Sequence, residues 1–302
     1  MKTRIITGIV LGVIIIPLVV IAGIPFLILG IVLSMIASFE MMNMFYTKSE
    51  ALKIVRYIVP ALTGILTFMV WYVNVELVAE EPSVFANQFW LVVVFLSCIV
   101  VIATILIFTK HSTAHDIANS IMALCYTGLI MGYVISIRYL TPVGTSEYFE
   151  TNFWGGRTMA YLFIIVVCTD TFAYFFGCRF GKHQLCPEIS PKKSIEGAIS
   201  GTVFGSIAGV LSAYIMNIIK VDNLKTAIIT AIVIFFISMF LSIMAQVGDL
   251  VASKFKRTYE IKDFGKIFPG HGGVLDRFDS MIWAGACLYI ITQIIQLGLL
   301  NS

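Results

Sequence analysis

Charged residues are scarce in this chain. Asp, Glu, Lys and Arg make up 12% of its 302 residues, hydrophobic residues make up 59%, and the mean hydropathy is +0.96. A soluble domain has roughly 25% charged residues. About half that share is too little to cover a water-facing surface, so the composition excludes an ordinary soluble protein and predicts one that lies in a bilayer. The net charge of +3 is also too small to indicate a nucleic-acid partner.

Paired cysteines and nucleotide-binding loops are lacking too. The six cysteines form no CxxC pair and mostly lie inside apolar runs, which argues against a disulfide framework and a zinc site. The stretch GCRFGKH at 177–183 resembles a P-loop, but it is one residue short between its glycines and has His where Ser or Thr is required. We therefore exclude a P-loop.

Long apolar runs, in contrast, are abundant. About 20 apolar residues cross the ~30 Å hydrocarbon core as a helix, and a signal peptide would explain only one such run. We expect an all-α integral membrane protein that forms a single polytopic domain over 1–302. Five helices are expected within about 1–150 and four catalytic helices within about 151–302. The nine predicted spans are roughly 5–22, 24–45, 53–74, 88–109, 116–138, 158–178, 195–219, 226–248 and 280–299.

The distribution of Lys and Arg indicates the orientation. With nine spans, sixteen of the twenty cations fall in loops on one side, and the other side has Arg138, Arg157, Lys220 and Lys225. Cationic loops are retained in the cytoplasm. We therefore expect a cytoplasmic N-terminus, an outside C-terminus and two polar cytoplasmic loops, 179–194 and 249–279.

Polar residues gather late in the chain, at one membrane face. A transporter typically has its polar groups near mid-bilayer, often at broken helices in two related halves. The first five predicted helices are nearly bare of charge, and no repeat between halves is evident. This pattern favours a site at the cytoplasmic interface, where a water-soluble reagent meets a lipid. A transporter of a phosphorylated solute is the alternative.

The seventh predicted helix has glycines at every fourth position, at 197, 201, 205 and 209. Such a stripe lets a second helix approach closely. We expect it to serve packing, with no chemistry of its own.

The end of the eighth predicted helix, QVGDLVASKFKR at 246–257, places four polar side chains on one stripe if the helix continues beyond the membrane. These are Asp249, Ser253, Lys256 and Arg257. A carboxylate, a hydroxyl and two cations can hold a metal ion and the phosphates that it bridges. The alternative is a solvated helix end whose cations extend towards water.

The stretch KDFGKIFPGHGGVLDRFDS at 262–280 favours the site. Pro269, Gly270, Gly272 and Gly273 allow a loop whose N–H groups face an anion. Mg²⁺ takes oxygen ligands together with substrate phosphates, and we expect Asp249 and Asp276 to be its protein ligands. His271 is expected to make a loop hydrogen bond or a phosphate contact, with a general base as the alternative. Countercharge is expected from Lys256, Arg257, Lys262, Lys266 and Arg277.

Two further stretches contribute candidates. In SPKKSIEG at 190–197, Lys192 and Lys193 precede a helix for which Ser194 is a plausible N-cap; they could equally be topology-setting lysines. Asp170 is expected to be the one carboxylate well inside a span, and such a charge usually marks function or a firm polar partner. Thr171 and Tyr174 could hydrogen-bond it.

Read as one string, SKFKRTYEIKDFGKIFPGHGGVLDRFD at 253–279 closely resembles the signature of the phosphatidate cytidylyltransferases, also called CDP-diacylglycerol synthases. QVGDL, DTFAYFFG and SPKKSIEG are similar to further stretches of that family, so the resemblance covers about 168–280. The positions that match the signature are Ser253, Lys256, Arg257, Lys262, Asp263, Gly265, Phe268, Pro269, His271, Gly272, Gly273, Asp276, Arg277 and Asp279.

The resemblance implies that the phosphate of phosphatidate attacks the α-phosphorus of CTP or dCTP, releasing pyrophosphate and forming CDP-diacylglycerol. It implies Mg²⁺ on Asp249 and Asp276, optionally beside a monovalent cation such as K⁺, in a homodimer of the bacterial inner membrane with its site facing the cytoplasm. Asp263 and Asp279 would orient other groups. A lipid kinase using CTP is the alternative enzyme. The expected catalytic residues are Asp249, Asp276, Lys256, Arg257, Lys262 and Arg277, and the expected substrate-binding residues are Ser253, Lys192, Lys193, Gly270, His271, Gly272, Gly273 and Asp170.

Overall fold

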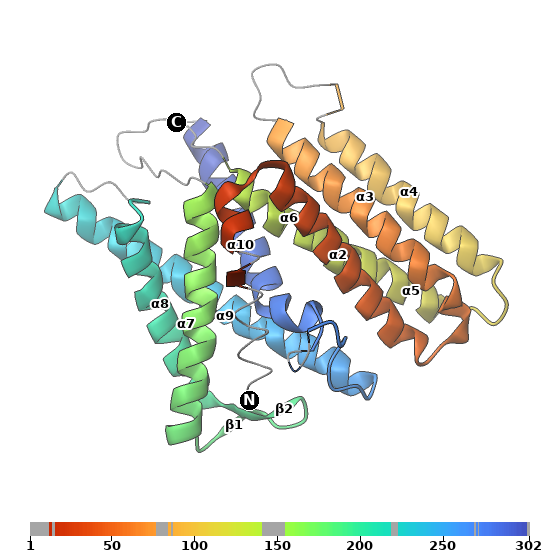
Figure 1. The fold of residues 1–302 in the computed structure, drawn as a ribbon. Coiled ribbons are helices and arrows are strands. Elements are labelled where there is room, and N and C mark those ends of the chain that lie inside the picture. Colours follow the sequence, from red (N-terminus) through yellow and green to blue (C-terminus); the bar gives the residue numbers. More distant parts are fainter. Residues whose placement is uncertain are drawn as a thin grey trace. The chain divides into compact units, whose positions relative to one another are not determined.

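The computed structural model describes residues 12–13, 16–76, 84–85, 87–140, 155–218, 223–268, 270 and 272–300, with side chains up to 296. Helices dominate it (Figure 1). The chain forms two compact units, each made of two segments: Met1–Ser136 with Phe255–Phe278, and Ile137–Lys254 with Asp279–Ser302. We call them the first and second unit. Two helices, α9 and α10, pass from one unit into the other.

Eight of the predicted spans are confirmed as helices long and apolar enough to cross a bilayer. They are α2 (Gly23–Tyr46), α3 (Val55–Glu76), α4 (Gln88–Ile107), a composite span (Ala114–Tyr139), α7 (Gly155–Phe180), α8 (Ile195–Ile215), α9 (Leu224–Thr258) and α10 (Leu275–Leu300). Half of the predicted helix at 5–22 falls outside the described residues. The count of nine and the orientation of the termini therefore stay predictions.

Large apolar side chains cover the outward faces of several helices. On α4, Val92, Leu96 and Val100 are more than half exposed, and on α8 Ile199 and Leu211 are also more than half exposed. A water-soluble protein rarely leaves so much contiguous apolar surface uncovered. Together with the eight long apolar helices, this supports a multi-pass membrane protein.

In the first unit, the composite span contains a widened turn. Its parts are α5 (Ala114–Ala123), the π-helix η2 (Leu124–Ile130), α6 (Met131–Ser136) and the 3₁₀ turn η3 (Ile137–Tyr139), of which η3 belongs to the second unit. Ser34 of α2 donates a hydrogen bond to the carbonyl of Thr127, and Thr67 of α3 donates to that of Gly128. A π-turn disturbs the regular ladder, and these hydroxyls add partners for its carbonyls inside an apolar bundle. Before α3 lies the short 3₁₀ helix η1 (Glu50–Lys53).

In the second unit, α7 and α8 lie side by side (Figure 1). The predicted role of the glycine stripe is confirmed, because all four glycines are buried. A Cβ atom on Gly201 would lie 2.7 Å from the carbonyl oxygen of Thr169, so only glycine allows this approach. Beside the stripe, the hydroxyls of Thr169 and Ser242 are 2.7 Å apart, which ties α9 to α7.

Two findings extend the predicted all-α fold. Strands β1 (Gln184–Cys186) and β2 (Ser190–Ser194) form a small antiparallel pair in the loop between α7 and α8. Helix α9 continues ten residues beyond the predicted end of its span at 248, to Thr258. The predicted N-cap is confirmed, since the Ser194 hydroxyl accepts a hydrogen bond from the N–H of Gly197.

Candidate active site

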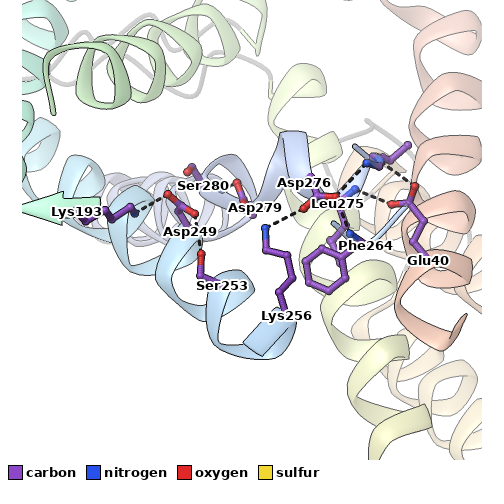
Figure 2. Close-up of polar contacts among 12 residues, drawn as sticks. Glu40, Lys193, Asp249, Ser253, Lys256, Phe264, Leu275, Asp276, Asp279 and Ser280 are labelled. Carbon is purple, nitrogen blue, oxygen red and sulfur yellow. Dashed lines mark hydrogen bonds and ion pairs between the residues drawn. The ribbon is translucent and has the colours of Figure 1, made fainter. Parts of the chain in front are cut away.

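The carboxylate of Asp276 lies at the start of α10 and is held by three donors of the first unit (Figure 2). Lys256 donates from its Nζ atom over 2.8 Å, and the N–H groups of Phe264 and Gly273 donate over 2.8 and 3.0 Å. The side chains of Lys256 and Asp276 are only 15% and 5% exposed. A charge-assisted pair with such shielding has a well-defined geometry. The structure thus brings together two predicted catalytic residues.

Sequence reasoning missed a second carboxylate, which comes from α2 and binds the loop before α10. Glu40 of α2 accepts hydrogen bonds from the N–H groups of Val274 and Leu275, each over 3.0 Å, and is 3% exposed. Glu40 is thus a second acidic side chain within an apolar helix, in addition to the predicted Asp170 of α7. Glu40 lies six residues before the end of α2. The signal that could have found it was a lone acidic residue within an otherwise apolar run.

The loop between α9 and α10 has the backbone that its glycines predict. Gly270 and Gly272 have φ angles of 77° and 87°, a conformation that glycine adopts at no steric cost. Gly273 is required for space instead, because a Cβ there would lie 2.3 Å from a carboxylate oxygen of Glu40. At 273–275 the N–H groups donate to the carboxylates of Asp276 and Glu40, and the binding of a substrate anion by this loop stays a prediction.

A separate polar cluster lies in the second unit, on α7, β2 and α9 (Figure 2). Asp249 pairs with the Nζ atom of Lys193 at 2.5 Å and accepts a longer hydrogen bond, 3.4 Å, from the hydroxyl of Ser253. Asp249 and Ser253 are four residues apart on α9, which continues to Thr258, so the predicted stripe on one helix face is confirmed. Asp170 is exposed and lies within electrostatic range of both Asp249 and Lys193. Three predicted site residues are therefore gathered around Asp249.

The remaining five predicted cations share one feature, their exposure. Lys192, Arg257, Lys262, Lys266 and Arg277 are exposed, as expected for groups that meet a water-soluble polyanion. Asp279 is buried, and its carboxylate accepts from the N–H of Ser280 over 2.7 Å. Pro269 and His271 lie outside the described residues, so the role of His271 stays a prediction.

The donor chemistry fits a hard cation better at Asp249 than at Asp276. Asp249 is 31% exposed and has Asp170 nearby, and carboxylate oxygens are the ligands that Mg²⁺ prefers. Asp276 already accepts from three donors, so it could bind a metal ion only if Lys256 moved away. Within the described residues, no group of three or more His, Cys, Asp or Glu side chains is arranged to hold a metal ion. Asp249 and Asp276 belong to different units, and their sharing of one ion stays a prediction.

Comparison with known proteins shows the family. The profile described as the cytidylyltransferase family matches residues 2–295. A protein of Bacillus subtilis (strain 168), named phosphatidate cytidylyltransferase, is 34% identical over 293 residues, which cover 96% of this chain and 97% of that protein. Proteins of the same name from Staphylococcus aureus (strain COL) and Staphylococcus haemolyticus are each 31% identical, over 96% of this chain and 98% of theirs. The range of the family profile includes the residues of both polar clusters. The chain therefore belongs to the cytidylyltransferase family and is a nucleotidyltransferase.

Proposed function

We propose that the enzyme transfers the CMP group of CTP to phosphatidate, giving CDP-diacylglycerol and pyrophosphate for phospholipid synthesis. The observation that carries this proposal is the similarity to proteins named phosphatidate cytidylyltransferase along 96% of the chain. The signature at 253–279 and the apolar helices around it agree with a lipid substrate and a nucleotide substrate.

In the proposed reaction, a phosphate oxygen of phosphatidate attacks the α-phosphorus of CTP. The new P–O bond forms as the bond from the α-phosphorus to the oxygen shared with the β-phosphorus breaks, and pyrophosphate leaves with that electron pair. The lipid phosphate is itself the nucleophile, so the protein supplies positioning and charge neutralisation. Lys193 and Lys256 are suited to this because each already faces a carboxylate of the site.

The proposal includes Mg²⁺ held by Asp249 and Asp276, with Asp170 beside the first of them, and optionally K⁺. When bound, the metal would neutralise phosphate charge and so lower the barrier between two anions. The chain's own contribution is to hold each carboxylate in place through a lysine and, for Asp276, through two N–H groups. A lysine that leaves its carboxylate can then contact phosphate oxygens. The exposed Arg257, Lys262 and Arg277 would attract the nucleotide.

We also propose that the site faces the cytoplasm of a bacterial cell and that the enzyme works as a homodimer. The sixteen-to-four split of cations in the nine-span topology supports the orientation, and the bacterial relatives support the setting. The dimer comes from the family resemblance alone.

Product analysis tests the proposed function. Purified protein in detergent is mixed with α-labelled CTP, Mg²⁺ and phosphatidate, and the products are separated. The proposal requires labelled CDP-diacylglycerol and one pyrophosphate per lipid product. Release of CDP with a phosphorylated lipid would instead identify a CTP-dependent kinase and would refute the transferase.

A further inference from the structure

Glu40 is a buried acidic residue that the proposed reaction does not use. It is 3% exposed and lies on α2. It accepts hydrogen bonds from the N–H groups of Val274 and Leu275, which are 234 and 235 positions away in the sequence. A buried carboxylate is costly unless it is hydrogen-bonded. Two hydrogen bonds at 3.0 Å satisfy it here (Figure 2).

The partners of Glu40 are the first amides of α10. Those amides have no acceptor within their own helix, and the residue before the helix, Val274, has no side-chain oxygen that could cap it. Glu40 therefore acts as a cap supplied by a distant helix. The positive end of the α10 dipole adds to the attraction.

Two glycines of the family signature make room for this carboxylate. A Cβ atom on Gly265 would lie 2.1 Å from an oxygen of Glu40, and one on Gly273 would lie 2.3 Å from it. Carbon atoms do not approach carboxylate oxygens this closely. A side chain at either position would therefore clash with the carboxylate of Glu40, and only glycine fits while Glu40 lies there.

We call Glu40 and its two hydrogen bonds to Val274 and Leu275 the clamp. The clamp is linked to the catalytic residues Asp276 and Lys256 through consecutive amides. The N–H of Gly273 donates to Asp276, and the next two N–H groups, of Val274 and Leu275, donate to Glu40. When Glu40 fixes the N–H groups of Val274 and Leu275, it also fixes the peptide planes that follow the N–H of Gly273. Asp276 in turn holds Lys256. Glu40 and Asp276 are thus linked through three consecutive amides of the loop.

We propose that Glu40 is a positioning residue for nucleotidyl transfer: it holds the loop 264–275 so that Asp276 and Lys256 meet the substrates in a fixed geometry. The inference rests on the proposed function for its kinetic part only. A misplacement of about 1 Å can lower a rate by about 100-fold, whereas substrate contacts made elsewhere are kept. A Glu40 variant should therefore lose kcat and retain the KM for CTP.

The principal test is Glu40→Gln, which keeps the size of the side chain but presents an NH₂ group where one backbone N–H needs an acceptor. We expect kcat to fall by about 10- to 100-fold with the KM for CTP within about twofold of wild type. Hydrogen exchange of peptides covering 264–278 should rise by at least about tenfold, because the amides of Val274 and Leu275 lose protection. Glu260→Gln, an exposed acidic residue of the same unit paired with Lys48, is the matched control and should change neither.

Gly265→Ala tests the same contacts while Glu40 itself is kept, and it serves if Glu40→Gln fails to fold. It should reproduce both effects, while Gly64→Ala, where the atom nearest to the new Cβ is the sulfur of the flexible Met35 side chain, should not. Wild-type exchange in both clamp variants, or raised exchange with an unchanged kcat, would overturn the proposal. If wild type makes no CDP-diacylglycerol, the proposed function fails, and the exchange measurement still decides whether Glu40 holds the loop.

Discussion

Each carboxylate predicted to bind metal is paired with a lysine, and the two ion pairs differ in burial. Lys256 and Asp276 are 15% and 5% exposed, whereas Lys193 and Asp249 are 28% and 31% exposed. Removing one partner of a buried pair leaves an uncompensated charge, which costs about 3–5 kcal/mol. A partly exposed pair contributes about 1 kcal/mol or less because water screens it.

We therefore expect Lys256→Met to lower the free energy of unfolding by about 3 kcal/mol and Lys193→Met by about 1 kcal/mol or less. Thermal unfolding in detergent, at matched protein concentration, measures both. Equal losses in the two variants would contradict the burial argument.

Asp249→Asn separates catalysis from stability. Asp249 lies within electrostatic range of Asp170, a like charge, so the neutral variant loses an ion pair and also relieves a repulsion. We expect an unfolding temperature close to that of wild type and a fall in pyrophosphate release of at least about 100-fold, the scale of losing one preorganised electrostatic group.

Glu188→Gln, an exposed residue in the turn of the same small hairpin as Lys193, is the control for Asp249→Asn. Full activity of Asp249→Asn would remove Asp249 from the metal site.

At the residue scale, sequence could predict local relations and missed distant ones. Ser194 as an N-cap and Ser253 four residues after Asp249 follow from helix geometry over one turn, and both are confirmed. The described hydrogen-bond partners of Glu40 are distant in sequence: the first, the N–H of Val274, lies 234 positions away. No spacing rule links such positions, and only the packing of α2 against the loop reveals the pair.

At the scale of elements, the helices follow from hydropathy because a bilayer demands long apolar runs with every backbone group hydrogen-bonded. Hydropathy does not say where a helix stops once it reaches water, which is why the continuation of α9 to Thr258 could be stated from the sequence only as a condition. It is equally blind to the π-turn at 124–130 and to the hairpin of β1 and β2, whose residues carry no distinct composition. The glycine stripe was predicted because its period of four is itself a helical signal.

Gly201→Ala tests the close approach of α7 and α8. Its new Cβ would lie 2.7 Å from a backbone oxygen of Thr169, and backbone cannot yield as a side chain can. We expect a loss of about 1–3 kcal/mol in the free energy of unfolding, the usual cost of overpacking. Val203→Ala, on an exposed face of the same helix, should cost less than about 1 kcal/mol. Wild-type stability of Gly201→Ala would show that the helices can separate at little cost.

At the scale of the whole molecule, the two ion pairs predict a protein that stays folded without the proposed metal ion. Lys193 and Lys256 already pair with Asp249 and Asp276, so neither of these carboxylates is left without a cationic partner when a divalent ion is removed. We expect EDTA to abolish pyrophosphate release and to lower the unfolding temperature by less than about 3 °C, which corresponds to about 1 kcal/mol for a chain of this size.

Added Mg²⁺ should restore the activity of EDTA-treated protein, as measured by pyrophosphate release. Unfolding in EDTA would show that the metal is structural. Undiminished activity in EDTA would refute its part in the reaction.

The length of α9 has a consequence for the membrane around the enzyme. Its 35 residues extend about 52 Å, against a hydrocarbon thickness of ~30 Å. A helix that exceeds the bilayer tilts or protrudes according to how thick the bilayer is. Asp249 and Lys256 lie in its last three turns, so the depth at which they reach the headgroups depends on the acyl chains of the surrounding lipids. Those lipids descend from the proposed product, so under the proposed function the thickness of the bilayer would bear on the position of the residues that make its lipids.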